Sequence, residues 1–183
     1  MTIVLNGTTG ITNTGALSVT GITTLGALGS SVITSGTSVA STSGTSIDFT
    51  SIPSWVKRIT VMFKAVSTSG TSPLQIQIGS GSVQTSGYAS SYWFASTGSN
   101  VITSGFAVTP MVAVYTVDGI ATIVNFGSNN WVFSSISNLL LNTNIGSQAI
   151  GDTALSGTLD RVRITTINGT DTFDAGTINI LYE

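Results

Sequence analysis

Residues 111–126 read MVAVYTVDGIATIVNF, and this stretch carries the plainest fold signal in the chain. Two runs rich in β-branched residues flank Asp118-Gly119, a pair that favours a tight hairpin because both central turn residues need a positive φ. A second turn signal, GSNN at 127–130, leads into WVFSSIS at 131–137. The sequence therefore predicts a three-stranded antiparallel meander here.

Further strand patterns lie on both sides of this stretch. They are SIDF at 46–49, WVKRITVMFKAV at 55–66, LQIQI at 74–78, DRVRITTI at 160–167 and GTINILYE at 176–183. In LQIQI apolar and polar residues alternate, which predicts that one face lies in the core and that Gln75 and Gln77 lie in water. We expect the last strand to be tied into a sheet.

Many short strands separated by turns rich in Gly, Ser and Thr indicate an all-β fold. We expect an antiparallel β-sandwich, of a jelly-roll-like kind, over residues 37–183. No segment long enough for a helix has apolar residues at helical spacing. A parallel solenoid is the structural alternative, and we disfavour it because no repeat continues beyond Ser30.

The chain opens with a short tandem repeat, in which TGITNTGALSV at 9–19 is followed by TGITTLGALGS at 20–30. Its apolar residues stand alone or in pairs among Gly, Thr and Ser, so the segment cannot close a core of its own. Such repeats bury their apolar side chains by stacking on neighbours. Because two copies are too few for a solenoid, we expect residues 1–36 to form an intertwined stem with other chains. The stem residues would be Ile3, Leu5, Ile11, Leu17, Ile22, Leu25 and Leu28. A disordered Gly-Thr leader is the alternative.

The composition restricts the possible functions. Charged residues make up only 7% of the 183 residues, but a hydrophobic fraction of 41% is enough to drive folding. The absence of His and Cys excludes disulfides, thiol nucleophiles and imidazole bases, and we expect no cofactor and no metal. A net charge of −2 argues against nucleic acid as a partner. The start lacks a signal-peptide pattern and no stretch has the length of a membrane helix, so we expect synthesis in a cytoplasm without membrane insertion.

Three phrases resemble the tail fibre proteins of tailed bacteriophages and prophages. They are LNGTTGIT at 5–12, TSGTSIDFTSIPSWVKRITVMFKAVSTSGTS at 42–72 and ALSGTLDRVRITTINGTDTFDAGTINILYE at 154–183. The last two are similar to the C-terminal domain of such fibres, and the first is similar to phrases of fibre stems. The resemblance covers most of the chain.

The resemblance implies a virion protein, a homotrimeric tail fibre whose β heads touch the bacterial host. The trimer number comes from this family and not from the residue spacing. The expected partners are copies of the chain itself, other virion tail or adaptor proteins at the N-terminus, and a host surface glycan or outer-membrane receptor. Two alternatives stay open. One is a purely structural head fibre, decoration or tail protein without a receptor role, and the other is a polysaccharide depolymerase.

Aromatic residues gather in SGYASSYWFASTGSN at 86–100. Flat amphipathic rings among small polar residues supply contact area at low entropic cost, as in antibody paratopes, and sugars stack on such rings. We therefore name Tyr88, Tyr92 and Trp93 as candidate receptor-binding residues, together with Trp131, which follows the GSNN turn. The alternative is that these rings, together with Phe94, fill the core of the sandwich.

The few charged residues point to ion pairs and turns more than to chemistry. In DRVRI the two arginines, Arg161 and Arg163, should share one strand face, where pairing with Asp160 or with a neighbouring chain's carboxylate is the simpler reading and binding of an anionic glycan the alternative. Most aspartates sit beside Gly or Thr in expected turns. We therefore expect no catalytic residues, and DTFD at 171–174 offers too few oxygen ligands for a firm calcium site.

Overall fold

In the computed structural model, residues 33–94, 97–140 and 144–183 are described, without the side chains of 97–100. The fold below is that of the unit Val32–Glu183. All seven of the expected stem residues, Ile3, Leu5, Ile11, Leu17, Ile22, Leu25 and Leu28, lie outside the described residues.

The described residues form strands and no helix, so the predicted all-β, antiparallel fold is confirmed. The larger sheet has the order β1 (Thr34–Ser35), β14 (Phe173–Tyr182), β4 (Arg58–Thr68), β10 (Thr116–Gly127), β11 (Asn130–Leu140), β12 (Asn144–Ala154), β7 (Ala89–Phe94) and β8 (Thr97–Ile102), and β2 (Val39–Ala40) also pairs with β14. The smaller sheet has the order β3 (Ser46–Thr50), β13 (Arg161–Thr166), β5 (Leu74–Ser80) and β6 (Ser82–Val83), and β9 (Phe106–Thr109) also pairs with β5. Within the described part of the chain no helix could cross a membrane.

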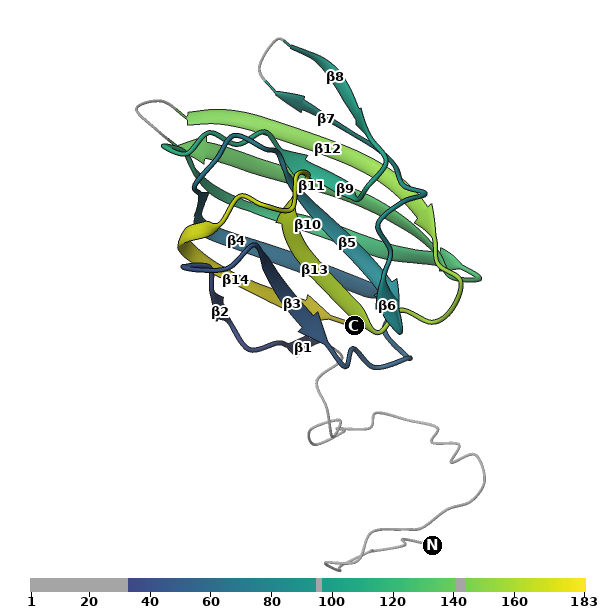
Figure 1. Cartoon of the computed structure of the whole chain (residues 1–183). Coiled ribbons are helices and arrows are strands. Elements are labelled where there is room, and N and C mark those ends of the chain that lie inside the picture. Colours follow the sequence, from purple (N-terminus) through teal and green to yellow (C-terminus); the bar gives the residue numbers. More distant parts are fainter. Residues whose placement is uncertain (1–32, 95–96, 141–143) are drawn as a thin grey trace, which may run out of the picture. The chain divides into compact units, whose positions relative to one another are not determined.

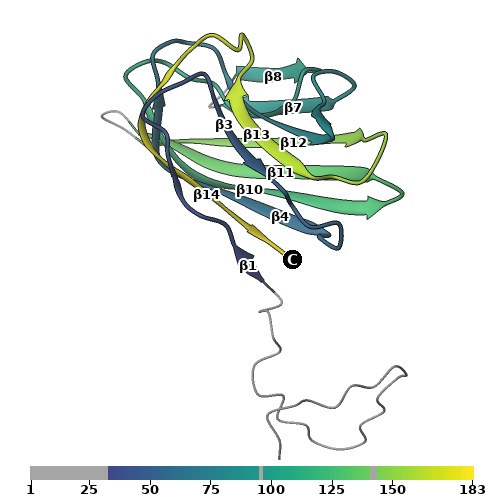
Figure 2. The same cartoon turned by 60° about the horizontal axis from the view of Figure 1, so that its bottom comes forward.

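The two sheets face each other across one hydrophobic core. Figures 1 and 2 show the smaller sheet lying across one face of the larger sheet. The ring of Phe106 in the smaller sheet stacks on that of Phe133 in the larger sheet, with ring centroids 4.7 Å apart and an interplanar angle of 6°. Tyr88 meets Phe106 edge-on at 4.9 Å. Such aromatic pairs stabilise the core beyond the area they bury.

The chain passes repeatedly from one sheet to the other. Strands β3, β4, β5 and β7 alternate between the smaller and the larger sheet, and so do β12, β13 and β14. The predicted strands over DRVRITTI and GTINILYE both exist, but they lie in different sheets. The last residue, Glu183, accepts hydrogen bonds through its carbonyl from the backbone N–H groups of Lys57 (2.7 Å) and Arg58 (2.8 Å), so the end of β14 is tied to β4 as expected.

The hairpin predicted at Asp118-Gly119 is wrong. Strand β10 runs through both residues, and residues 111–115 do not form the expected first strand. The tight turn falls at 127–130, where Ser128 and Asn129 have φ values of 48° and 61°. The GSNN turn is therefore confirmed, and the meander consists of β10, β11 and β12.

Asp118 and Gly119 have other structural roles in the larger sheet. The carboxylate of Asp118 accepts the backbone N–H of Ala65 at 2.6 Å and pairs with the Lys64 ammonium at 3.0 Å. Ala65 has a φ of 52° and lies in a bulge of β4, where the register with β10 shifts. Gly119 allows a close approach of β11, because a Cβ there would lie 2.6 Å from the carbonyl oxygen of Ile136. Asp118 therefore clamps a bulge, and Gly119 makes room for a neighbouring strand.

The expectation that Gln75 and Gln77 face water is also wrong. Their exposed fractions are 1% and 6%. Neighbouring segments cover the outer side of β5 and satisfy the amides: Gln75 donates to the carbonyl of Thr166 and accepts from Ser104 Oγ. The alternation of the strand is real, but both of its faces are covered.

Candidate interaction surfaces

The outer face of the larger sheet, which points away from the smaller sheet, carries exposed apolar side chains among polar ones such as Ser134 and Asp152. In β11 the side chains of Trp131 and Phe133 point into the core, so Val132 and Ile136 point outward. Cross-strand neighbours continue this pattern, since Ile120 pairs with Ile136 and Val124 with Val132. We name this surface the apolar outer face; its exposed residues are Ile120, Val124, Val132, Ile136 and Ile150, with Trp93 and Val101 toward β7 and β8.

Two hollows lie in the apolar outer face. The larger has a volume of about 640 Å³, and its lining includes Val101, Val132, Ile150 and Asp152. The second, of about 320 Å³, is lined by Trp93, Ile136, Gly146, Ser147 and Gln148. Side chains from β7, β8, β11 and β12 therefore shape a surface that is uneven as well as apolar.

Charged residues border the apolar outer face. At one end Lys64 pairs with Asp118, and at the other Arg58 forms an ion pair with Glu183. Burial tends to raise the pKa of Asp118, but the hydrogen bond from Ala65 and the charge of Lys64 outweigh it and hold that pKa below its usual range. An apolar centre with a polar border is the anatomy of protein–protein interfaces.

The outer face of the smaller sheet is polar. Arg161 and Arg163 share this face of β13, while Val162 and Ile164 are fully buried on the other, as the sequence predicts. Both guanidinium groups are held by two hydrogen bonds to a carboxylate: Arg161 binds Asp160 at 2.7 and 3.1 Å. Arg163 binds Asp48 at 2.7 and 2.9 Å.

A hollow of about 320 Å³ lies on this polar face. Its lining includes Gln75, Gln77, Thr85, Ser104, Arg163 and Thr165. We name it the polar hollow. The glutamines that line it are among the most buried polar residues of the chain, and hydrogen bonds fix their amide groups. This hollow therefore has a rigid, polar wall.

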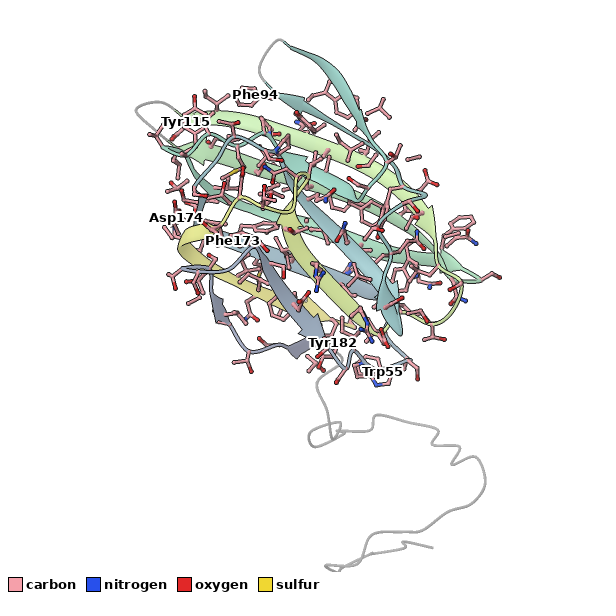
Figure 3. All side chains as sticks on the ribbon, in the orientation of Figure 1. Trp55, Phe94, Tyr115, Phe173, Asp174 and Tyr182 are labelled. Carbon is pink, nitrogen blue, oxygen red and sulfur yellow. The ribbon has the colours of Figure 1, made fainter. Side chains whose placement is uncertain are left out.

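The structure separates the four candidate receptor-binding residues. Tyr88, Tyr92 and Trp131 are buried in the core, whereas Trp93 is 43% exposed. The hydroxyl of Tyr88 accepts the N–H of Ile78 at 2.9 Å, and burial raises the pKa of Tyr88 to about 12. For these three rings the structure supports the alternative that they fill the core, and as placed they present no ring face to a ligand. Phe94, labelled in Figure 3, is partly buried and packs against the core.

The two aspartates of the DTFD stretch differ in their surroundings. Asp171 of the DTFD stretch accepts the backbone N–H of Ser72 at 2.9 Å and the side-chain amide of Asn168 at 2.7 Å. Asp174, seen beside Phe173 in Figure 3, is exposed. Among the residues that the structure describes, no group of three His, Cys, Asp or Glu could hold a metal ion.

Sequence reasoning missed the apolar outer face, although a signal for it exists. In WVFSSIS the alternation of β11 places Trp131 and Phe133 on one face, but Val132 and Ile136 on the other are apolar too. A strand with apolar residues on both faces and no charge is typical of a strand covered on both sides.

No family model, no curated protein and no solved structure matches the chain. The function is therefore inferred from the two outer faces of the sandwich.

Proposed function

We propose that this chain is a structural virion protein, one subunit of a homotrimeric bacteriophage tail fibre that adheres to the bacterial surface without chemistry. The observation that carries the proposal is the apolar outer face of the larger sheet. In each subunit this face would pack against the other copies of the chain. The alternation of the chain between the two sheets supports the jelly-roll-like form of the sandwich head.

Exposure of this face to water is costly. Ile136 is 65% exposed and lies opposite Ile120. Further along the same two strands Val124 lies opposite Val132, with the polar pair Thr122 and Ser134 between them. Large exposed apolar patches are uncommon on monomeric proteins and are typical of interaction sites. Burial of such a patch between subunits is favourable by roughly 25 cal/mol for each Å² removed from water.

The charge pattern favours further copies of the same chain as the occupant. The charged residues at the border, Lys64 with Asp118 and Arg58 with Glu183, neutralise each other within one subunit. Apart from Asp152, which forms no ion pair among the described residues, identical faces can therefore meet without strong like-charge repulsion. The tandem repeat at the N-terminus supports association as well, because its apolar residues need neighbours, and the number three follows from the resemblance to fibre proteins.

The proposal is for a binding protein and not for an enzyme. The chain has no His and no Cys. Asp48, Asp118 and Asp160 are each held in an ion pair, and Asp171 in loop hydrogen bonds. Pairs of free carboxylates at a suitable distance, as glycoside hydrolysis requires, are not formed by these four residues.

The association is tested by the mass of the full chain in solution, measured by light scattering. We expect three times the chain mass of 18.7 kDa. Ile136→Asp should give monomers, because a buried, unpaired carboxylate costs several kcal/mol. Thr50→Asp is the matched control, since it adds the same charge to an exposed position on the outer face of the smaller sheet. A monomeric wild-type chain would refute the proposed assembly.

The adhesive role needs its own test. Fluorescently labelled protein is applied to a panel of bacterial strains with defined surface polysaccharides, and bound protein is counted by flow cytometry. Adherence to some strains and not to others supports a receptor role. An oligomer that adheres to none of them would instead be a purely structural virion part.

A further inference from the structure

The geometry points to a binding site for an uncharged sugar in the polar hollow on the outer face of the smaller sheet. This inference rests on the proposed adhesive function and names a surface that would make the contact. The hollow lies on the sheet opposite the apolar outer face, so that a ligand and the other subunits can be bound at the same time.

Three side chains form a row across the smaller sheet. Arg163 in β13 lies opposite Asp48 in β3 and opposite Gln77 in β5. Neighbouring strands are about 4.8 Å apart, so an acceptor, a donor and another acceptor follow one another at short intervals. The next row, Ser46, Thr165 and Gln75, continues this polar surface in the same direction.

Hydrogen bonds hold the side chains around the hollow in place. Gln77 is only 6% exposed, and its Nε2 donates to the carbonyl of Ser104 at 2.9 Å. The hydroxyl of Ser104 donates to Gln75 Oε1 at 2.8 Å. Thr165 donates its hydroxyl to the carbonyl of Thr45 at 2.8 Å. A ligand would therefore meet groups that lose little conformational freedom when they bind.

Some donor and acceptor atoms that line the polar hollow have no hydrogen-bond partner within the described part of the chain. Gln77 Oε1 has no donor among the described residues and is not fully enclosed by protein. Nη1 of Arg163 has no acceptor there, because only Nε and Nη2 bind Asp48. The hydroxyl oxygen of Thr165 can still accept a hydrogen bond. The hollow thus offers one donor group between several acceptors.

A sugar hydroxyl suits this pattern because it donates and accepts at the same time. One hydroxyl can donate to Gln77 Oε1 and accept from Arg163, and a neighbouring one can donate to the hydroxyl oxygen of Thr165. Asp48 does not line the hollow and acts by holding Arg163. An anionic ligand suits it less, since the carboxylate of Asp48 already compensates the charge of Arg163. The volume of about 320 Å³ is at the lower end for small-molecule sites and fits a short part of a longer glycan.

The test uses the full chain in its native assembly on a glycan array. The array carries neutral hexose oligosaccharides, N-acetylhexosamine oligosaccharides and uronate-containing oligosaccharides. Wild type should bind neutral sugars. Arg163→Met and Gln77→Met should each weaken this binding by roughly ten-fold or more, the effect of losing a hydrogen bond in a fixed site.

Arg161→Met is the matched control. Arg161 lies on the same face of the same strand and is also paired with an aspartate, but it does not line the hollow. It should leave sugar binding unchanged. Circular dichroism and the mass in solution show that all three variants keep the fold and the assembly.

Other outcomes overturn the inference. They are binding of uronates alone, equal binding by the Arg163 and Arg161 variants, and no sugar binding at all. The inference and the proposed function fail under different results. If wild type and Arg163→Met adhere to cells equally well, the hollow is not the binding site but the adhesive function stands. If wild type adheres to no cells, the adhesive function itself is refuted.

Discussion

The two sheets share one core but differ on their outer faces. Inward, both carry apolar side chains, such as Phe133 in the larger sheet and Ile164 in the smaller one. Outward, β11 presents Val132 and Ile136, whereas β13 presents Arg161 and Arg163. The inner faces hold the sandwich together, and the difference between the outer faces agrees with the two proposals, which place protein on one face and a polar ligand on the other.

The largest effect should come from a change to the packing that both sheets share. Phe133→Ala removes the ring that stacks on Phe106 and leaves a cavity between the sheets. We expect the free energy of unfolding to fall by about 3–5 kcal/mol. Chemical denaturation at a fixed protein concentration measures it. Val132→Ala, one residue away on the outer face, is the control and should change the unfolding of a dissociated subunit by less than about 1 kcal/mol.

A smaller effect is expected from filling the space beside Gly119, a change confined to the larger sheet. In Gly119→Ala the new Cβ would lie 2.6 Å from the Ile136 carbonyl oxygen and 2.7 Å from Ser137 Cα. Both atoms belong to backbone and cannot move aside alone, so we expect a loss of about 1–3 kcal/mol in the free energy of unfolding. A Cβ at Gly146 in the same sheet would meet nothing within 4 Å. Equal stability of the two alanine variants would contradict the close approach of β10 and β11.

The ion pairs of the two sheets should contribute differently to the free energy of unfolding. Asp118 clamps the bulge at Ala65, whereas Asp48 forms an exposed pair with Arg163. We expect Asp118→Asn to lower the free energy of unfolding by about 1–2 kcal/mol. Asp48→Asn should lower it by less than about 1 kcal/mol, because exposed pairs contribute little. Denaturation of both variants beside wild type at neutral pH measures the difference.

The contribution of Asp118 should also depend on pH in a defined direction. Its folded-state pKa lies below the ordinary value of 3.8, despite partial burial, because of the Ala65 N–H and Lys64. The stabilisation is therefore complete above the unfolded-state pKa and is lost as the pH falls through the folded-state pKa. Wild type and Asp118→Asn should differ in stability by the same amount from pH 6 to about pH 4, and the difference should shrink as the pH falls further, through the folded-state pKa. A difference that stays constant in this lower, acidic range would exclude the carboxylate as the cause.

The smallest effect is expected at a buried hydroxyl on the inner face of the larger sheet. Ser137 is buried, and its Oγ has no hydrogen-bond partner in the described part of the chain. Ser137→Ala removes an unsatisfied polar group and should leave stability within about 0.5 kcal/mol of wild type or raise it slightly. A clear loss of stability in thermal denaturation would reveal a bound partner for this hydroxyl, such as an internal water.

The sequence predicts what depends on local patterns. The alternation in β13 correctly separates Arg161 and Arg163 from the buried Val162 and Ile164, and the turn at GSNN is where its residues indicate. These features follow from the period of two along a strand and from residues that tolerate a positive φ.

What the sequence does not predict depends on distant segments. Asp118-Gly119 has the composition of a turn, but its role is decided by the bulge in β4 and by the backbone of β11. Gln75 and Gln77 alternate like exposed residues, yet segments from elsewhere in the chain cover them. Tyr92 and Trp93 are consecutive in β7 and point to opposite faces of the sheet, and the second sheet decides which of these faces is buried. None of these three outcomes can be read from neighbours in the sequence.

The central claim, that copies of the chain cover the apolar outer face, is tested most directly by thiol labelling. The chain has no cysteine, so each variant carries a single thiol. Ile136→Cys on the apolar outer face and Thr50→Cys on the outer face of the smaller sheet are treated with a maleimide in the intact assembly and after dissociation in denaturant. We predict that Cys labelling at position 136 is at least ten-fold slower in the assembly and that labelling at position 50 is fast in both states. Equal labelling rates at the two positions in the assembly would contradict the claim.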